Sequence, residues 1–125
     1  MLHVKDSSEL SVTLTLSSVS VEFADVTYDT EIGVGKPLVL TCKTVKPVEE
    51  CQWSWKSDKT PDSVLMRQFQ SFGNESRDCS LRFETVASEH EGIWTCAARY
   101  EWQTTFKAAH PIQLTVLTGN SNAII

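Results

Sequence analysis

Four cysteines arranged around a pair of tryptophans constrain the fold of this chain more than any other feature. Cys42 and Cys96 bracket Trp53 and Trp55, and Cys96 closes the run EGIWTC. Four cysteines permit three pairings, and none of them lies in a Cys-x-x-Cys motif. Structural zinc usually needs ligands paired at short spacing, and the three histidines are scattered. We therefore expect no metal and no cofactor, and we expect disulfides formed in an oxidising compartment.

Apolar and polar residues alternate at short intervals along the chain, and no segment shows a sustained helical period. Turn residues such as Gly35 and Pro37 separate the alternating segments. The segments are 38–42, 51–56, 79–84, 94–98 and 112–116, with a less regular one at 64–69. All four cysteines fall on the apolar phase of these segments. About seven short strands of this kind predict an all-β domain built as an antiparallel sandwich.

The charge and hydropathy of the chain exclude several kinds of partner. The formal net charge is −5, and lysine and arginine form no dense run. Nucleic-acid binding and docking to anionic membranes through a basic patch are therefore not expected. No stretch approaches the roughly 18 apolar residues of a membrane-spanning helix, so any membrane attachment would come from a segment absent from this chain. The first residues lack the pattern of a signal peptide.

In this order, the segments resemble the immunoglobulin superfamily over residues 24–117. The motifs that carry the resemblance are GKPLVLTC at 35–42, a tryptophan at 53 or 55, CSLRF at 79–83 and HEGIWTC at 90–96. The spacing between Cys42 and Cys96, and the lack of a Gly-x-Gly bulge in 104–116, are similar to the intermediate set rather than to antigen-receptor variable domains. The second cysteine pair resembles that of immunoglobulin modules in invertebrate cell-surface and secreted proteins.

The resemblance implies a two-sheet antiparallel immunoglobulin-like β-sandwich with Greek-key connections. In such a sandwich the strands that carry Cys42 and Cys96 face each other, and Cys51 and Cys79 begin strands of opposite sheets. We therefore expect the disulfides Cys42–Cys96 and Cys51–Cys79.

Two tryptophans are expected in the core. An indole should pack against the Cys42–Cys96 bond, and Trp53 and Trp55 share the apolar face of their segment. We favour Trp53 because the strand starts at Cys51, and Trp55 stays open as the alternative. Trp94 is the second expected core tryptophan.

The corner before Cys96 departs from the family pattern. The family usually has Asp-x-Gly-x-Tyr-x-Cys there, and the tyrosine hydroxyl bonds back to the backbone. Here His90 takes the aspartate position and Trp94 the tyrosine position. An indole offers only an N–H donor, so we expect a different local geometry, in which Glu89 or Glu91 substitutes for the aspartate in a pairing with arginine.

The chain is longer than one immunoglobulin module of about 100 residues requires. We expect an N-terminal extension at 1–23, the domain at 24–117 and a C-terminal tail at 118–125. In the extension, one alternating set is followed by a second in the opposite phase: Val12, Leu14 and Leu16, then Val19, Val21 and Phe23. An extended first strand along both sheets, an additional or exchanged strand that supports dimerisation, or the tail of a preceding module would each account for this pattern.

No catalytic constellation is present, and we expect no enzymatic activity. The chain has no Gly-x-Ser-x-Gly elbow, and the histidines have no motif that would orient a base. Asn74 begins a glycosylation sequon, NES, in a polar loop.

Two clusters are candidate partner-binding sites. Arg99, Tyr100 and Trp102 lie at an expected hairpin end, where interfaces favour such residues. Met66, Phe69 and Phe72 form a second apolar cluster. The alternative for the first is that its aromatic rings fold over the end of the sandwich, and for the second that it packs in the core and at the edge.

These observations predict an extracellular domain that recognises another protein, without a small-molecule substrate. By resemblance it would belong to a cell-surface receptor, an adhesion molecule or a secreted immune factor. The alternatives are a spacer module in a multidomain ectodomain and a homodimerisation module that uses the N-terminal strands.

Overall fold

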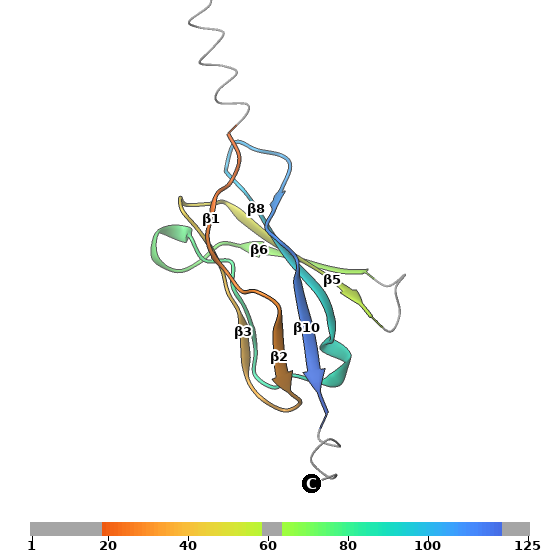
Figure 1. Ribbon diagram of the computed structural model, residues 1–125. Coiled ribbons are helices and arrows are strands. Elements are labelled where there is room, and N and C mark those ends of the chain that lie inside the picture. Colours follow the sequence, from red (N-terminus) through yellow and green to blue (C-terminus); the bar gives the residue numbers. More distant parts are fainter. Residues whose placement is uncertain (1–18, 59–63, 119–125) are drawn as a thin grey trace, which may run out of the picture.

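The computed structural model describes residues 19–58 and 64–118 (Figure 1), which form short strands and two single turns of 3-10 helix. The strands are β1 Phe23–Val26, β2 Thr30–Gly33, β3 Leu38–Leu40, β4 Cys42–Thr44, β5 Glu50–Ser57, β6 Val64–Gln70, β7 Leu81–Phe83, β8 Gly92–Arg99, β9 Lys107–Ala108 and β10 Ile112–Leu117. The 3-10 turns are η1 Asn74–Ser76 and η2 Ser88–His90.

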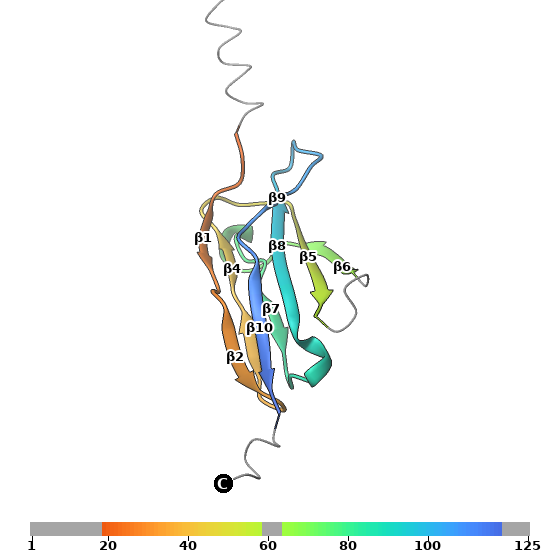
Figure 2. The same cartoon turned by 45° about the vertical axis from the view of Figure 1, so that its right-hand side comes forward.

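The strands form two packed layers, which confirms the predicted sandwich. The larger sheet has the order β2-β10-β8-β5-β6, with β9 also beside β8. In the other layer β1 pairs with β4, and β3 pairs with β7. In Figure 2, β10, β8 and β5 run side by side in front of β4 and β7. The pairs between described strands are antiparallel, except that β2 and β10 are parallel.

The first part of the described chain runs along both layers. β1 pairs with β4, and after a crossing at 27–29 the chain continues as β2 and pairs with β10. This course resembles an extended first strand, one of the three interpretations of the N-terminal pattern. Residues Val12, Leu14 and Leu16 lie outside the described residues.

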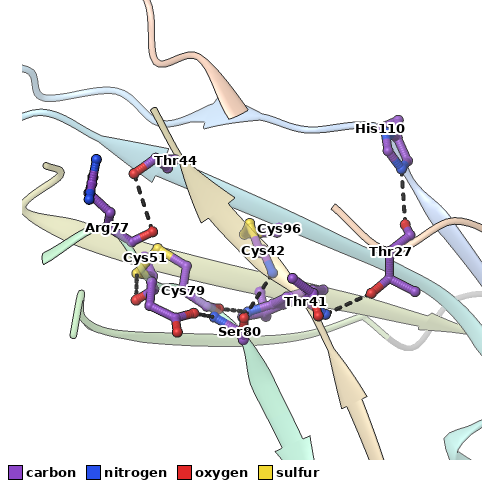
Figure 3. The surroundings of a disulfide bond; sticks show 12 residues. Thr27, Thr41, Cys42, Thr44, Cys51, Arg77, Cys79, Ser80, Cys96 and His110 are labelled. Carbon is purple, nitrogen blue, oxygen red and sulfur yellow. Dashed lines mark hydrogen bonds between the residues drawn. A yellow bond between two sulfur atoms is a disulfide. The ribbon is translucent and has the colours of Figure 1, made fainter. Parts of the chain in front are cut away.

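Side-chain hydroxyls divide the predicted strand 38–42 into β3 and β4. The Thr41 amide donates to Oγ1 of Thr27 at 2.7 Å, and the Cys42 amide donates to Oγ of Ser80 at 3.0 Å (Figure 3). Such bonds compete with the ladder between strands, so the regular pairing is interrupted at this point. The inward phase of the strand continues through the break, because Leu40 and Cys42 are both buried.

The core lies between the layers, on the apolar phases that the sequence indicates. The buried residues of these phases are Cys51 and Trp53 in β5, Trp94, Cys96 and Ala98 in β8, and Ile112, Leu114 and Val116 in β10. Burial of alternate residues is what period-2 patterning requires of strands that cover a core on one face.

Both expected disulfides are formed. Cys42 bonds to Cys96 and Cys51 bonds to Cys79, and all four residues are fully buried (Figure 3). The pairs are 54 and 28 positions apart in sequence. Loop-closure entropy assigns such crosslinks about 4 and about 3.5 kcal/mol of stability. These contributions are large beside the net stability of about 5–15 kcal/mol typical of a domain.

An indole replaces the tyrosine hydroxyl at the corner before β8. The Trp94 Nε1–H donates to the His90 carbonyl at 2.9 Å, and His90 Nδ1 accepts the Ala87 amide at 2.9 Å. Phe83 packs edge-on against Trp94, with ring centroids 5.2 Å apart. The corner is therefore closed by a donor that needs no hydroxyl.

The expected substitution of a glutamate for the corner aspartate takes another form. Glu91 accepts the Val116 amide at 2.8 Å, which ties the corner to β10. Neither Glu91 nor Glu89 forms an ion pair with an arginine among the described residues. The expectation of an arginine pair was wrong for Glu91, because its carboxylate instead satisfies a backbone donor of the neighbouring strand.

Candidate functional site

The loop from Arg99 to Phe106, here called the tryptophan loop, is fastened to the end of the sandwich by hydrogen bonds. Arg99 forms an ion pair with Glu50 at 2.9 Å and donates from Nη1 to the Gln103 carbonyl at 2.9 Å. Gln103 accepts the Tyr100 amide on its side chain at 2.9 Å, and its own amide donates to the Tyr100 carbonyl at 3.0 Å. These bonds give the loop a defined conformation.

The tryptophan loop is also tied to the start of the described chain. The Gln103 side-chain N–H donates to the Val19 carbonyl at 2.8 Å. The loop and the start of the described chain lie at the same end of the sandwich, whereas η2 lies at the opposite end (Figures 1 and 2). The guanidinium of Arg99 lies over the Phe106 ring, 5.9 Å from its centroid. Gln103 therefore ties the loop to the start of the described chain, and the contact between Arg99 and Phe106 joins the two ends of the loop.

Trp102 is the exposed residue of this loop. Its side chain is 62% exposed, and its ring stacks on Tyr100 at a centroid distance of 4.8 Å. Tyr100 is only 4% exposed, so this ring covers the end of the core and supports the indole above it. Of the two aromatic residues expected at this end, Tyr100 thus packs in the domain and Trp102 faces solvent.

A second candidate surface is the outer face of β5, β6 and β8. The strand registers place Ser54 beside Met66 and Thr95, and Gln52 beside Gln68. The side-chain amide of Gln68 donates to that of Gln52 at 2.8 Å. The charged residues on this face stand at its ends: Lys56 at one end, and the Glu50–Arg99 pair at the other. The middle of the face is therefore uncharged.

Three exposed apolar side chains lie on that outer face: Val64, Met66 and Ile93. Met66 is 56% exposed on β6, which forms an edge of the larger sheet. The middle of this face is uncharged and has exposed Met66 at an open edge, a composition found in the centre of protein interfaces.

The cluster expected from Met66, Phe69 and Phe72 is divided between surfaces. Phe69 pairs in register with Cys51 and is half-buried on the core side, whereas Met66 faces outward. The two residues are three positions apart, and an odd separation places side chains on opposite faces of a strand. Phe72 follows β6, is exposed, and packs against Phe69 at 6.2 Å between ring centroids. The three residues therefore do not form one surface.

Asn74 is exposed in η1, in the tight loop that follows β6. Glu75 and Ser76 adopt positive φ angles in this loop, and Glu75 forms an ion pair with Arg77 at 3.2 Å. The side chain of Asn74 is therefore accessible for glycosylation.

We expect the chain to carry one N-linked glycan when it is secreted from eukaryotic cells, because NES is the one sequon in its sequence. Asn74→Gln should remove the glycan, and Ser76→Thr, which preserves the sequon, should retain it. Intact mass before and after treatment with a glycan-cleaving amidase measures this. A parent chain whose mass does not change on treatment with the amidase would show that the residue is unmodified.

Neither a metal centre nor a membrane-spanning helix is found among the described residues. They contain no group of three or more His, Cys, Asp or Glu residues that could hold a metal ion. A search of the same residues finds no helix that is long and apolar enough to cross a membrane.

The two-layer fold with its buried interlayer disulfide defines an immunoglobulin-like domain. The immunoglobulin I-set domain model matches residues 21–116, and the chain belongs to this family. Domains of this family are typical of protein–protein recognition in adhesion molecules and receptors, and they are generally not enzymes. No curated protein sequence matches the chain significantly.

Solved structures share the fold at low sequence identity. The crystal structure of a chicken TCR is similar with a TM-score of 0.64 and 15% identity over 79% of this chain and 56% of that one. The crystal structure of Duf (Kirre) D1 is similar with a TM-score of 0.61 and 20% identity, over 79% of this chain and 98% of that one. The crystal structure of Rst D1-D2 is similar with a TM-score of 0.62 and 20% identity, over 80% of this chain and 50% of that one. This chain thus spans about half of the TCR and Rst chains. At this level of identity the likeness shows the fold alone.

Proposed function

We propose that this domain is an extracellular recognition module that binds another protein through the tryptophan loop and the adjoining outer face of β5, β6 and β8. The two disulfides support an extracellular or cell-surface location, because such bonds persist in oxidising compartments. The single observation that carries the proposal is the exposed Trp102 indole, which is stacked on a buried Tyr100 ring.

A fixed indole is suited to binding because it loses little conformational freedom when a partner covers it. Aromatic residues and arginine dominate the energetics of protein interfaces, and rigid anchors bind with less entropic cost. Gln103 and Arg99 satisfy the polar groups of the loop internally, so the loop is organised before a partner arrives. This pre-organisation distinguishes Trp102 from an aromatic residue that is merely exposed.

The loop and the sheet face are connected at the Glu50–Arg99 pair. Arg99 ends β8 and begins the loop, and Glu50 begins β5, whose outer side contributes Gln52 and Ser54. A partner of ordinary size covers about 800 Å² on each protein, which is more than a single loop provides. The outer face of β5, β6 and β8 therefore supplies the remaining contact area.

Trp102→Ala is expected to weaken binding of the partner by at least about 30-fold, the effect of losing a hot spot worth about 2 kcal/mol. The partner is first identified by an unbiased screen of the multimerised domain against extracellular proteins, and affinity is then measured by surface plasmon resonance. Because Trp102 is exposed, thermal unfolding of the variant should stay close to that of the parent. Met66→Asp should also weaken binding, since it places a charge on the apolar part of the face.

Tyr28→Ala is the matched control. Tyr28 is also an exposed aromatic residue stacked on a second ring, that of His110 at 4.9 Å, but it lies outside the proposed surface. Its loss should leave affinity unchanged. Binding that survives both Trp102→Ala and Met66→Asp contradicts the proposal, and a domain that captures no protein in the screen supports a spacer role instead.

A further inference from the structure

The layer that contains β7 has an open edge. β7 pairs with β3 on one side, and no described strand lies beside it on the other. After β6 the chain crosses between the layers, and two backbone bonds of 3.0 Å between Phe72 and Asp78 close only the part of the edge before β7. The stretch Leu81–Phe83 is left uncovered.

The register of β7 directs backbone groups outward at this edge. Leu81 and Phe83 stand opposite Leu40 and Leu38, in phase with Cys79, whose amide donates to the Cys42 carbonyl at 2.7 Å. Residues that exchange bonds across an antiparallel pair alternate with residues whose N–H and C=O point away from it. The N–H and C=O of Arg82 therefore face the open edge, where an additional strand would bond to them.

An apolar pocket of about 320 Å³ opens beside the same edge. It is lined by rings from three strands, namely Trp53, Trp55, Phe83 and Trp94, together with Leu81 and Leu65. Leu65 is 60% exposed, and Trp55, Leu81 and Phe83 are only half-buried, so the core is open to the side here. An apolar side chain that entered the pocket would complete the burial of these residues.

The mouth of the pocket is positively charged, although the chain as a whole is acidic. Arg67 and Arg82 line the pocket with one carboxylate, that of Glu89. Both arginines are exposed, and neither forms an ion pair with another described residue. An acidic residue that flanks an apolar strand would complement this mouth.

We propose that the edge of β7 accepts residues 9–16 of a second copy of this chain as an added strand. The segment reads ELSVTLTL, in which Leu10, Val12, Leu14 and Leu16 alternate with small polar residues, and Glu9 precedes them. One face of such a strand presents apolar side chains to the pocket. Its backbone bonds to Arg82, and its acidic end pairs with the arginines, as in binding by strand addition.

The reach of the chain favours a second copy as the donor of this strand. Val19 precedes β1 in the sequence and is held beside the tryptophan loop by its hydrogen bond with Gln103. A strand added to β7 lies three strand spacings from β1, which is about 14 Å. The chain from Val19 to Leu16 can span at most about 11 Å, which is less than this distance. The whole segment would also have to run along β7 from that point. The donor is therefore another copy, and the contact produces self-association.

Sedimentation of the full chain over a range of concentrations tests this. The parent should associate, and Leu14→Asp should raise the dissociation constant at least tenfold, whereas Thr13→Asp, on the opposite face of the segment, should leave it within about threefold. On the acceptor side, Arg82→Glu should weaken association, and Lys107→Glu on β9 should not. A parent that stays monomeric at all concentrations overturns the proposal, as do equal effects of the two segment variants.

Hydrogen exchange at low and high concentration locates the contact. The Arg82 amide and the amides of residues 10–16 should exchange more slowly in the associated state. Protection confined to β5, β6 and β8 would overturn the proposal in favour of contact through their outer face. Trp102→Ala should leave self-association unchanged, so failure of the proposed recognition function and failure of this inference are distinguishable.

Discussion

Trp53→Ala is expected to lower the free energy of unfolding by at least about 3–5 kcal/mol, the usual cost of truncating a large core side chain. Trp53 is 1% exposed and stands opposite Cys96 in the β5–β8 register. Its Nε1–H donates to the Cys79 carbonyl at 2.6 Å. The variant leaves this buried carbonyl without its partner, which adds about 1–3 kcal/mol. The total is comparable with the whole stability of many domains.

Denaturant melts of Trp53→Ala and Trp55→Ala, compared with the parent under oxidising conditions, measure this difference. Trp55 is the matched control because it is on the same strand and the same face, yet it is half-buried and its buried Nε1 has no partner among the described residues. Its loss should therefore cost clearly less than the loss of Trp53. If Trp55→Ala is the more damaging variant, the indole that supports the two disulfides has been misassigned.

Much of the fold is predictable from the sequence because burial in a sandwich follows a period of two. Cys51 and Trp53, or Cys96 and Ala98, are two positions apart, and each pair must face the same side of its strand. The cysteine pairing follows once the strands are assigned to layers. The parallel pairing of β2 with β10 is not predictable in this way, because it depends on where the first strand crosses between layers.

The candidate site is less predictable because loops have no period. The sequence shows that Tyr100 and Trp102 lie together, but not that the first is buried and the second exposed. The contribution of Gln103 was missed altogether, because one glutamine in a polar stretch carries no signal until its partners Tyr100 and Val19 are in place. The Glu50–Arg99 pair can be predicted only when the register between β5 and β8 is known, because the two residues are 49 positions apart in sequence.

Gly92→Ala should destabilise the domain by about 2–6 kcal/mol, even though replacing glycine by alanine usually reduces the entropy of the unfolded chain. Gly92 has a φ of +148°, which L-residues rarely adopt, and such strain costs about 1–3 kcal/mol. An added Cβ would also lie 2.3 Å from the Lys56 carbonyl oxygen and 2.9 Å from Nε1 of Trp55. Overpacking of this kind costs about 1–3 kcal/mol more.

The clash at Gly92 cannot be relieved by a rotating side chain, because its nearest atom belongs to the backbone of β5, which pairs with β8 along its whole length. Gly33→Ala is the matched control, since Gly33 has no positive φ and the nearest atom to its Cβ would be Cγ of the flexible Lys36 at 3.6 Å. That variant should be neutral, or more stable by about 0.4–1 kcal/mol. Denaturant melts that place Gly92→Ala within about 1 kcal/mol of the parent would mean that β5 and β8 separate more easily at this end than their pairing implies.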